Sequence, residues 1–173
     1  MQYLYAPWRS EYFEKEKSEC PFCDCANKIK SDEELGVIFR AKYCFGVMNR
    51  YPYSAGHFMI IPYLHEEHIE NLSDEAWQEI SQFVRLGVRI LKSELHAGGV
   101  NIGMNLSKDA GAGIAPHCHY HLVPRWAGDT NFITTIGETR VCGTNIEQVY
   151  QKLVLAFKNV VGGKIKCNHR KIK

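Results

Sequence analysis

The chain has 173 residues and a mass of 19.8 kDa, which fits one domain able to bury a hydrophobic core. With 45% hydrophobic and 23% charged residues, its composition excludes a wholly disordered, collagen-like or coiled-coil protein. The formal net charge of +2 is too small to indicate a nucleic-acid-binding protein. Its apolar runs are shorter than the roughly 20 residues of a membrane span, and the start of the chain lacks the apolar region of a signal peptide. We therefore expect a soluble, cytoplasmic protein with no membrane partner.

Short apolar segments, separated by turn-forming residues, predict strands after a loop-rich leader at residues 1–35. The expected strands cover residues 36–40, 44–48, 57–62, 101–105 and 117–124.

Two amphipathic segments predict helices. The first begins after Ser73, a suitable N-cap, and is expected to end at the glycine pair 98–99. The second follows a capping box of Thr144 and Glu147 and is expected to end near Gly162. The apolar positions that carry the helical spacing are Trp77, Ile80, Val84, Ile90 and Leu91 in the first, and Ile146, Val149, Leu153 and Phe157 in the second.

This order of elements indicates a single α+β domain over residues 1–162, built on an antiparallel sheet of about five strands. Residues 163–173 form a basic tail, which is either a solvated end or an electrostatic contact.

The most informative segment is HCHYHLVPR, residues 117–125. Side chains alternate faces along a strand, so His117, His119 and His121 would project to the same side, spaced by about 7 Å. Neutral imidazole can attack phosphorus or bind a metal, and its cation can hold phosphate oxygens. The pattern therefore favours a polar site over an ordinary strand.

A glycine-rich loop lies just before these histidines. Gly111, Ala112 and Gly113 can turn backbone N–H groups toward an anion, because glycine allows positive φ and close approach. Asn105 closes the preceding strand and can donate to a phosphate or a leaving group. Beside the histidines, this loop predicts phosphate binding.

Cys20 and Cys23 have the spacing with which two thiolates share one tetrahedral metal. A redox pair would instead open a helix after a strand, which the neighbouring residues do not predict. The seven cysteines are an odd number and cannot all form internal disulfides, which favours thiols or metal ligands. Two further ligands must come from elsewhere in the chain.

Together these motifs resemble the histidine triad (HIT) family of nucleotide hydrolases and transferases, whose signature is His-x-His-x-His. The segments HLVPRWAGDTNF, APWRSEY and CPFC are similar to the bacterial branch that includes diadenosine-polyphosphate phosphorylases and hydrolases. The resemblance covers residues 5–132 and implies a HIT-like fold, an AMP-containing nucleotide substrate and a homodimer, in which the helix around Trp77 could form the interface.

The resemblance also implies roles for individual residues. His119 would attack the α-phosphorus and form a covalent nucleotidyl-histidine, while His121 would contact phosphate and orient the leaving oxygen. A backbone carbonyl is expected to fix the tautomer of His119. The remaining substrate-binding candidates are Gly111, Ala112, Gly113 and Asn105 for phosphates, Asn49 for ribose, and Phe45, Met48 and Ile38 for either the base or the core.

For the metal, the resemblance implies a structural zinc site formed by Cys20, Cys23, His65 and His117, with His68 as the alternative to His65.

Many members of the family carry glutamine where this chain has Gly113, which fits the phosphorylase-related branch. The expected function is cleavage of a nucleoside phosphate anhydride or ester. The alternative is a nucleotide-binding sensor or scaffold with little turnover. A zinc-stabilised RNA-binding module is disfavoured by the near-neutral charge.

Overall fold

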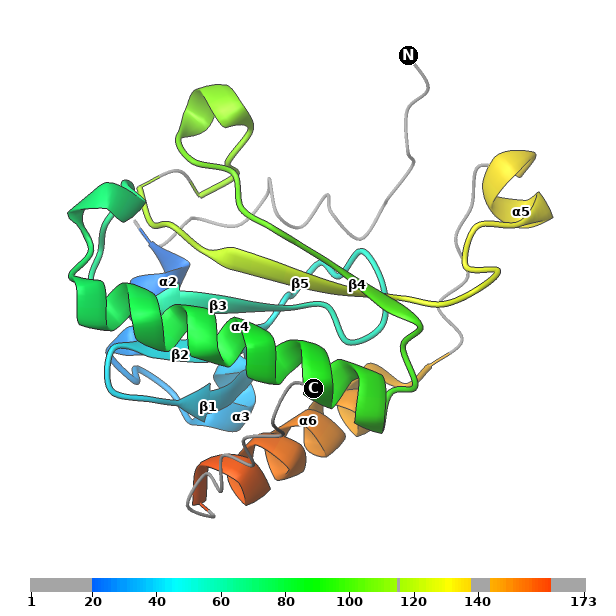
Figure 1. Ribbon diagram of the computed structural model, residues 1–173, viewed down its shortest axis with the longest axis horizontal. Coiled ribbons are helices and arrows are strands. Elements are labelled where there is room, and N and C mark those ends of the chain that lie inside the picture. Colours follow the sequence, from blue (N-terminus) through cyan, green and yellow to red (C-terminus); the bar gives the residue numbers. More distant parts are fainter. Residues whose placement is uncertain (1–19, 115, 138–143, 163–173) are drawn as a thin grey trace, which may run out of the picture.

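The computed structural model describes residues 20–114, 116–137 and 144–162 (Figure 1). Most of the leader and the basic tail lie outside these residues. The described part contains a five-stranded antiparallel sheet with the order β1-β2-β3-β5-β4. The strands are β1 (Val37–Arg40), β2 (Cys44–Met48), β3 (Phe58–Pro62), β4 (Gly99–Gly103) and β5 (Tyr120–Arg125). This confirms the expected α+β class and the antiparallel sheet.

Two long helices, α4 and α6, lie side by side on one face of this sheet (Figure 1). Three short helices complete the α-helices of the described residues, and none of the described helices is both long and apolar enough to cross a membrane. The helices are α2 (Pro21–Ala26), α3 (Asp32–Leu35), α4 (Asp74–Glu94), α5 (Phe132–Thr135) and α6 (Ile146–Gly162), with 3-10 turns η2 (Ile69–Asn71) and η3 (Lys108–Ala110).

The N-cap predicted for the first long helix is present, but its predicted end is not. The Ser73 side chain accepts a hydrogen bond from the Ala76 N–H at 3.2 Å. The helix ends at Glu94, before the glycine pair, because His96 takes the left-handed conformation at φ 53°. The Ala97 N–H then donates to the Leu91 carbonyl, six residues earlier, in the last turn of the helix. His96 therefore adopts the left-handed conformation that glycine usually adopts after a helix.

The cap of α6 lies one residue later than the sequence pattern predicts. The Asn145 side chain, not that of Thr144, accepts from the N–H groups of Glu147 and Gln148, at 2.9 and 3.3 Å. Ile146 is therefore the first residue of the helix, and 47% of its surface is exposed. The rest of the expected apolar stripe, Val149, Leu153 and Phe157, is buried as predicted.

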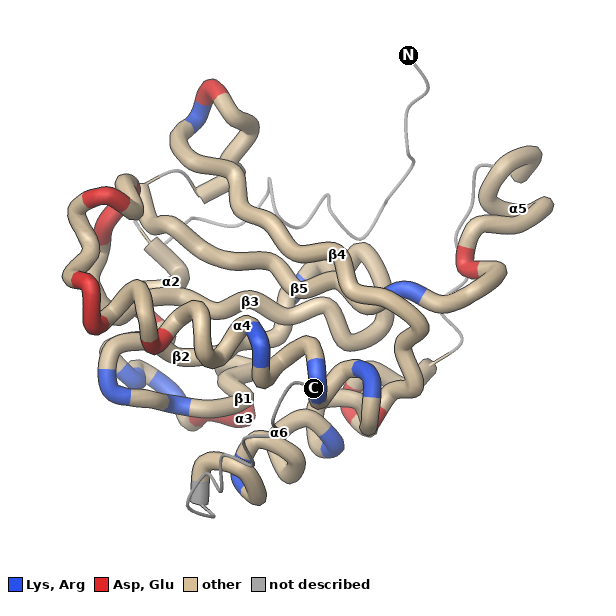
Figure 2. Tube along the Cα trace, in the orientation of Figure 1, with Lys and Arg blue, Asp and Glu red and all other residues tan. Residues whose placement is uncertain are grey.

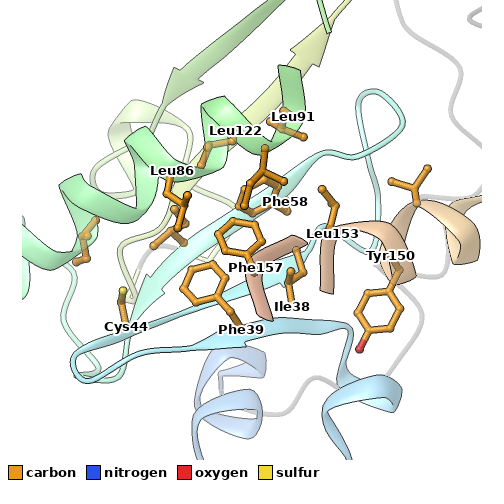
Figure 3. Close-up of a cluster of buried hydrophobic side chains, with 14 residues drawn as sticks. Ile38, Phe39, Cys44, Phe58, Leu86, Leu91, Leu122, Tyr150, Leu153 and Phe157 are labelled. Carbon is orange, nitrogen blue, oxygen red and sulfur yellow. The ribbon is translucent and has the colours of Figure 1, made fainter. Parts of the chain in front are cut away.

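The main core lies between the sheet and the two long helices (Figure 3). Phe157 of α6 stacks on Phe39 with ring centroids 4.5 Å apart and meets Phe58 edge-on at 5.8 Å. Gly87 of α4 is needed for this packing, since a Cβ there would lie 2.7 Å from Leu122 and 2.8 Å from Phe58. The close contact brings α4 down onto β3 and β5, the strands that carry the site.

A second, smaller core lies on the other face of the sheet. Met59 and Ile61 of β3 point there, while Phe58 and Ile60 point toward the long helices, as strand alternation requires. This second core is covered by α2, through Cys20, Phe22 and Cys25.

The strand carrying the three histidines starts later than predicted. β5 begins at Tyr120, so His117 and His119 precede it, and simple alternation does not govern their directions. The ring centroids of His119 and His121 lie 4.9 Å apart, closer than the roughly 7 Å that separates the Cα atoms of alternate strand positions.

Candidate active site and metal cluster

The structure brings together the four side chains named for the metal, from segments far apart in the sequence. One ligand atom from each of Cys20, Cys23, His65 and His117 lies within 4.8 Å of all the others. The Cys20 Sγ is 3.3 Å from Nδ1 of His117, and the Cys23 Sγ is 3.0 Å from Nδ1 of His65. His68 lies outside this cluster, exposed and 3.9 Å from the Glu70 carboxylate.

The cluster has the donor atoms that zinc prefers, and the measured separations of 3.0, 3.3 and 3.8 Å between sulfur and nitrogen atoms are near those of a zinc site. Zinc bonds of about 2.0–2.3 Å at tetrahedral angles place ligand atoms roughly 3.4–3.8 Å apart. His117 is already in the right tautomer, since its Nε2 is 2.9 Å from the Pro62 carbonyl, to which only a protonated nitrogen can donate. The Nδ1 lone pair therefore faces the cysteines. Without a bound cation, burial and the neighbouring Cys20 raise the pKa of Cys23 to about 11, and coordination would reverse this shift.

The cysteine pair does open a helix, contrary to the expectation from its flanking residues. Cys20 is the N-cap of α2 and Pro21 occupies its first turn, where the missing N–H of proline has no consequence. The helical start therefore does not separate a metal site from a redox site. The two histidines beside the cysteines favour the metal.

His119 is held with its nucleophilic nitrogen available. Its Nδ1 lies 2.8 Å from the His117 carbonyl oxygen and donates to it, so the lone pair is on Nε2. Burial lowers the pKa of His119, which favours the neutral ring. The residue can thus act as a nucleophile at neutral pH.

A fourth histidine, His57, completes a relay of hydrogen bonds to His121. The backbone N–H of Tyr53 donates to Nδ1 of His57 at 3.1 Å, which places the His57 proton on Nε2. That Nε2–H donates to Nδ1 of His121 at 2.9 Å. The His121 proton must then be on Nε2, where it can be donated to a substrate oxygen.

Burial keeps this pair neutral. It lowers the pKa of His57 to about 3, with further repulsion from His121 and His119. It lowers the pKa of His121 to about 4, with His119 as the second cause. Both rings are therefore uncharged at neutral pH, and the Nε2–H of His121 is a neutral hydrogen-bond donor.

The glycine-rich loop is internally hydrogen-bonded. Gly111 has the expected positive φ of 88°, but its N–H donates to the Lys108 carbonyl, and the Ala112 N–H donates to Ser107. The Asn105 side chain donates to the Gly111 carbonyl at 3.3 Å. These groups would have to exchange partners to hold a phosphate, so the role of this loop, including Gly113, stays a prediction.

Of the residues predicted to bind the nucleoside, only Asn49 lies beside the histidines, and the others pack in the two cores. Asn49 is half-buried at the site, with its amide nitrogen 3.3 Å from the His57 ring. Phe45 has no exposed surface and packs on Tyr63, so in this structure it belongs to the second core and offers no face to a base. Met48 packs against the main core and Ile38 lies in it.

The HIT domain matches residues 30–128, more than half of the chain. The chain belongs to the HIT family. A zinc-bound histidine triad family protein from Mycobacterium smegmatis has the same fold, with a TM-score of 0.67 and 24% identity over 84% of this chain and 97% of that one.

Two curated HIT relatives have assigned reactions in their names. An AP-4-A phosphorylase from Mycobacterium tuberculosis is 43% identical over 111 residues, which cover 64% of this chain and 57% of that protein. A bis(5'-adenosyl)-triphosphatase from Saccharomyces cerevisiae is 29% identical over 93 residues, 52% of this chain and 44% of that protein. The chain thus spans little more than half the length of the first relative.

Two residues of this HIT site were not identified from the sequence. His57 was assigned only to a strand, although alternation places it on the face of Met59, whose cross-strand partner is His121. Phe22 lies between the two cysteines in the sequence, and no pattern there indicates a contact with the three histidines. In the structure its ring lies against His119, with centroids 4.9 Å apart.

Proposed function

We propose that this HIT protein transfers a nucleotidyl group from a dinucleoside polyphosphate through a covalent intermediate on His119. The observation that carries the proposal is the hydrogen bond from His119 Nδ1–H to the His117 carbonyl, which leaves the lone pair on Nε2. The likeness to an AP-4-A phosphorylase over 111 residues supports diadenosine tetraphosphate as the substrate and inorganic phosphate as the acceptor.

Each histidine has a separate role in the two-step reaction. Nε2 of His119 attacks the α-phosphorus, a phosphorus–nitrogen bond forms, and the phosphorus–oxygen bond to the leaving polyphosphate breaks. The Nε2–H of His121 donates to the bridging oxygen as negative charge develops there. The acceptor then attacks the same phosphorus and releases His119. His57 acts through His121 by fixing its tautomer.

We propose zinc as the occupant of the Cys20, Cys23, His65 and His117 cluster. With four protein ligands the site is closed, as structural zinc sites are. Zinc would hold α2 and the segment before β5 together.

We also propose a homodimer with no nucleic-acid partner. β4 is an edge strand of the described sheet, and 47% of Ile102 on it is exposed, which leaves an edge available for a second copy. Figure 2 shows Lys and Arg on several separate elements of the described chain, among them α4 and α6, rather than along one continuous stripe. Sedimentation of the wild type against Ile102→Asp tests the edge, and an unchanged dimer would place the interface elsewhere.

Incubation with diadenosine tetraphosphate, with and without inorganic phosphate, tests the reaction. We expect ADP and ATP only when phosphate is present; AMP and ATP without phosphate would show a hydrolase. His119→Ala should lose turnover, whereas His96→Asn, an exposed histidine at the end of α4, should not change it. Nucleotide binding without turnover by the wild type would establish the sensor alternative.

A further inference from the structure

Phe22 lies between the metal cluster and the nucleophile. It is 4% exposed, on α2, between the two cysteines of the cluster. Its ring meets the His117 ring edge-on, with centroids 5.6 Å apart, and lies 4.9 Å from the His119 ring at an angle of 54°. One side chain therefore contacts both a cluster histidine and the histidine proposed to attack phosphorus.

We propose that Phe22 is a positioning residue through which the occupancy of the cluster sets the orientation of His119. This inference rests on the proposed function of His119. A single hydrogen bond to the His117 carbonyl fixes its tautomer, but one bond leaves the ring free to tilt about it. The Phe22 ring on one side and the His121 ring, 4.9 Å away on another, restrict that tilt.

The position of Phe22 in turn depends on the cluster. α2 has only six residues, too few to be stable alone, and no side chain caps its N-terminus. Apart from packing in the second core, its described ties to the sheet are the cluster contacts of Cys20 and Cys23 and a bond from the Arg40 guanidinium to the Cys25 carbonyl at 2.8 Å. Ligation of both cysteines would therefore fix the helix that carries Phe22.

The consequence is that the cluster contributes to catalysis by positioning His119, without itself touching the substrate. A nucleophile displaced by about 1 Å from its line of attack can lose up to a hundredfold in rate. Loss of the Phe22 ring should reduce the rate of attack while leaving substrate contacts in place. A general loss of packing would not have this specific effect. Phe157, which is buried on the opposite face of the sheet, provides the control for it.

The experiment compares Phe22→Leu with Phe157→Leu, the same substitution at a buried ring with no described histidine contact. The first readout is the imidazole spectrum of His119 by long-range ¹H–¹⁵N NMR at pH 7.5, assigned with His119→Gln. In the wild type and in Phe157→Leu, removing zinc with a chelator should shift the His119 signals. In zinc-loaded Phe22→Leu, confirmed by metal analysis, the response should be less than a third as large.

The second readout is steady-state kinetics on diadenosine tetraphosphate with phosphate. Phe22→Leu should lower kcat about tenfold and change KM less than twofold, and Phe157→Leu should leave both within twofold after correction for the folded fraction. Equal NMR responses in wild type and Phe22→Leu would overturn the inference, and so would an unchanged kcat. If the wild type turns over no nucleotide, the proposed function fails and the NMR comparison decides the role of Phe22. If Phe22→Leu does not fold, Phe22→Met takes its place, with the same expected results.

Discussion

The two faces of the sheet are buried by different means. On one face, a helix of 21 residues and another of 17 cover a core of aliphatic and aromatic side chains (Figures 1 and 3). On the other, a helix of six residues covers a smaller core and is joined to the sheet by a cluster of two cysteines and two histidines. The first face is buried by the chain alone, whereas on the second we propose that a bound metal completes the contact.

The two histidines proposed to take part in the reaction, His119 and His121, lie on the second face. His121 pairs with Met59 of the neighbouring strand and His119 lies against Phe22, so both adjoin the second core. The fold thus separates stability from chemistry. The apolar face supplies a rigid base, and the polar face sets the position of the reactive groups.

Metal removal should have the largest effect and should act on the second face alone. We expect a chelator to lower the free energy of unfolding by about 4 kcal/mol, the linkage value for free zinc a thousandfold above its dissociation constant. Denaturant unfolding measures it, with metal content determined in parallel. Cys23→Ser should abolish the response, and Cys25→Ser, a neighbouring cysteine outside the cluster, should retain it. A wild type that is indifferent to the chelator would refute the contrast between the faces.

The stability lost by opening a cavity in the core on the first face should not depend on the metal. Leu153 is fully buried beneath α6, so Leu153→Ala should cost about 2–5 kcal/mol from lost burial and the cavity left behind. Because the two cores do not share side chains, the loss should be the same within about 0.5 kcal/mol with and without zinc. A cost that changed on chelation by more than that would show that the faces are coupled through the sheet.

Lowering the pH should reduce the free energy of unfolding, because His57 is buried as a neutral ring on the second face. The pKa of this buried ring is lowered to about 3, so below its ordinary pKa of about 6.5 the unfolded chain binds a proton that the folded chain does not. The free energy of unfolding therefore falls as the pH falls. Between pH 6.5 and 5.5, the wild type should lose about 1 kcal/mol more than His57→Gln, whose amide can replace the donated hydrogen bond. Parallel pH profiles for the two proteins would contradict the assigned burial of a neutral His57.

Local patterns predicted most of the fold. Strands and long helices follow from apolar periodicity, and the Ser73 cap from the residue type. The errors lie at ends, where tertiary contacts decide. Nothing in the sequence indicates that His96 would end α4 in a left-handed conformation before two glycines, or that β5 would begin only at Tyr120.

The site was predictable where its residues are close in sequence and less so where it depends on register. The histidine spacing indicated the segment that we propose to react, and the resemblance named the four cluster residues that the structure brings together. The partnership of His57 with His121 depends on how β3 pairs with β5, which no local pattern determines. The contact of Phe22 with His119 likewise depends on how α2 packs on the sheet.

The most direct test of the central claim is to trap the reaction on diadenosine tetraphosphate labelled at the α-phosphorus, in the absence of phosphate, and to locate the label by mass spectrometry of a digest. The account predicts one acid-labile AMP group on the peptide that contains His119, absent from His119→Ala and discharged to ADP when phosphate is added. Turnover without any labelled peptide, or the same label on His119→Ala, would contradict it.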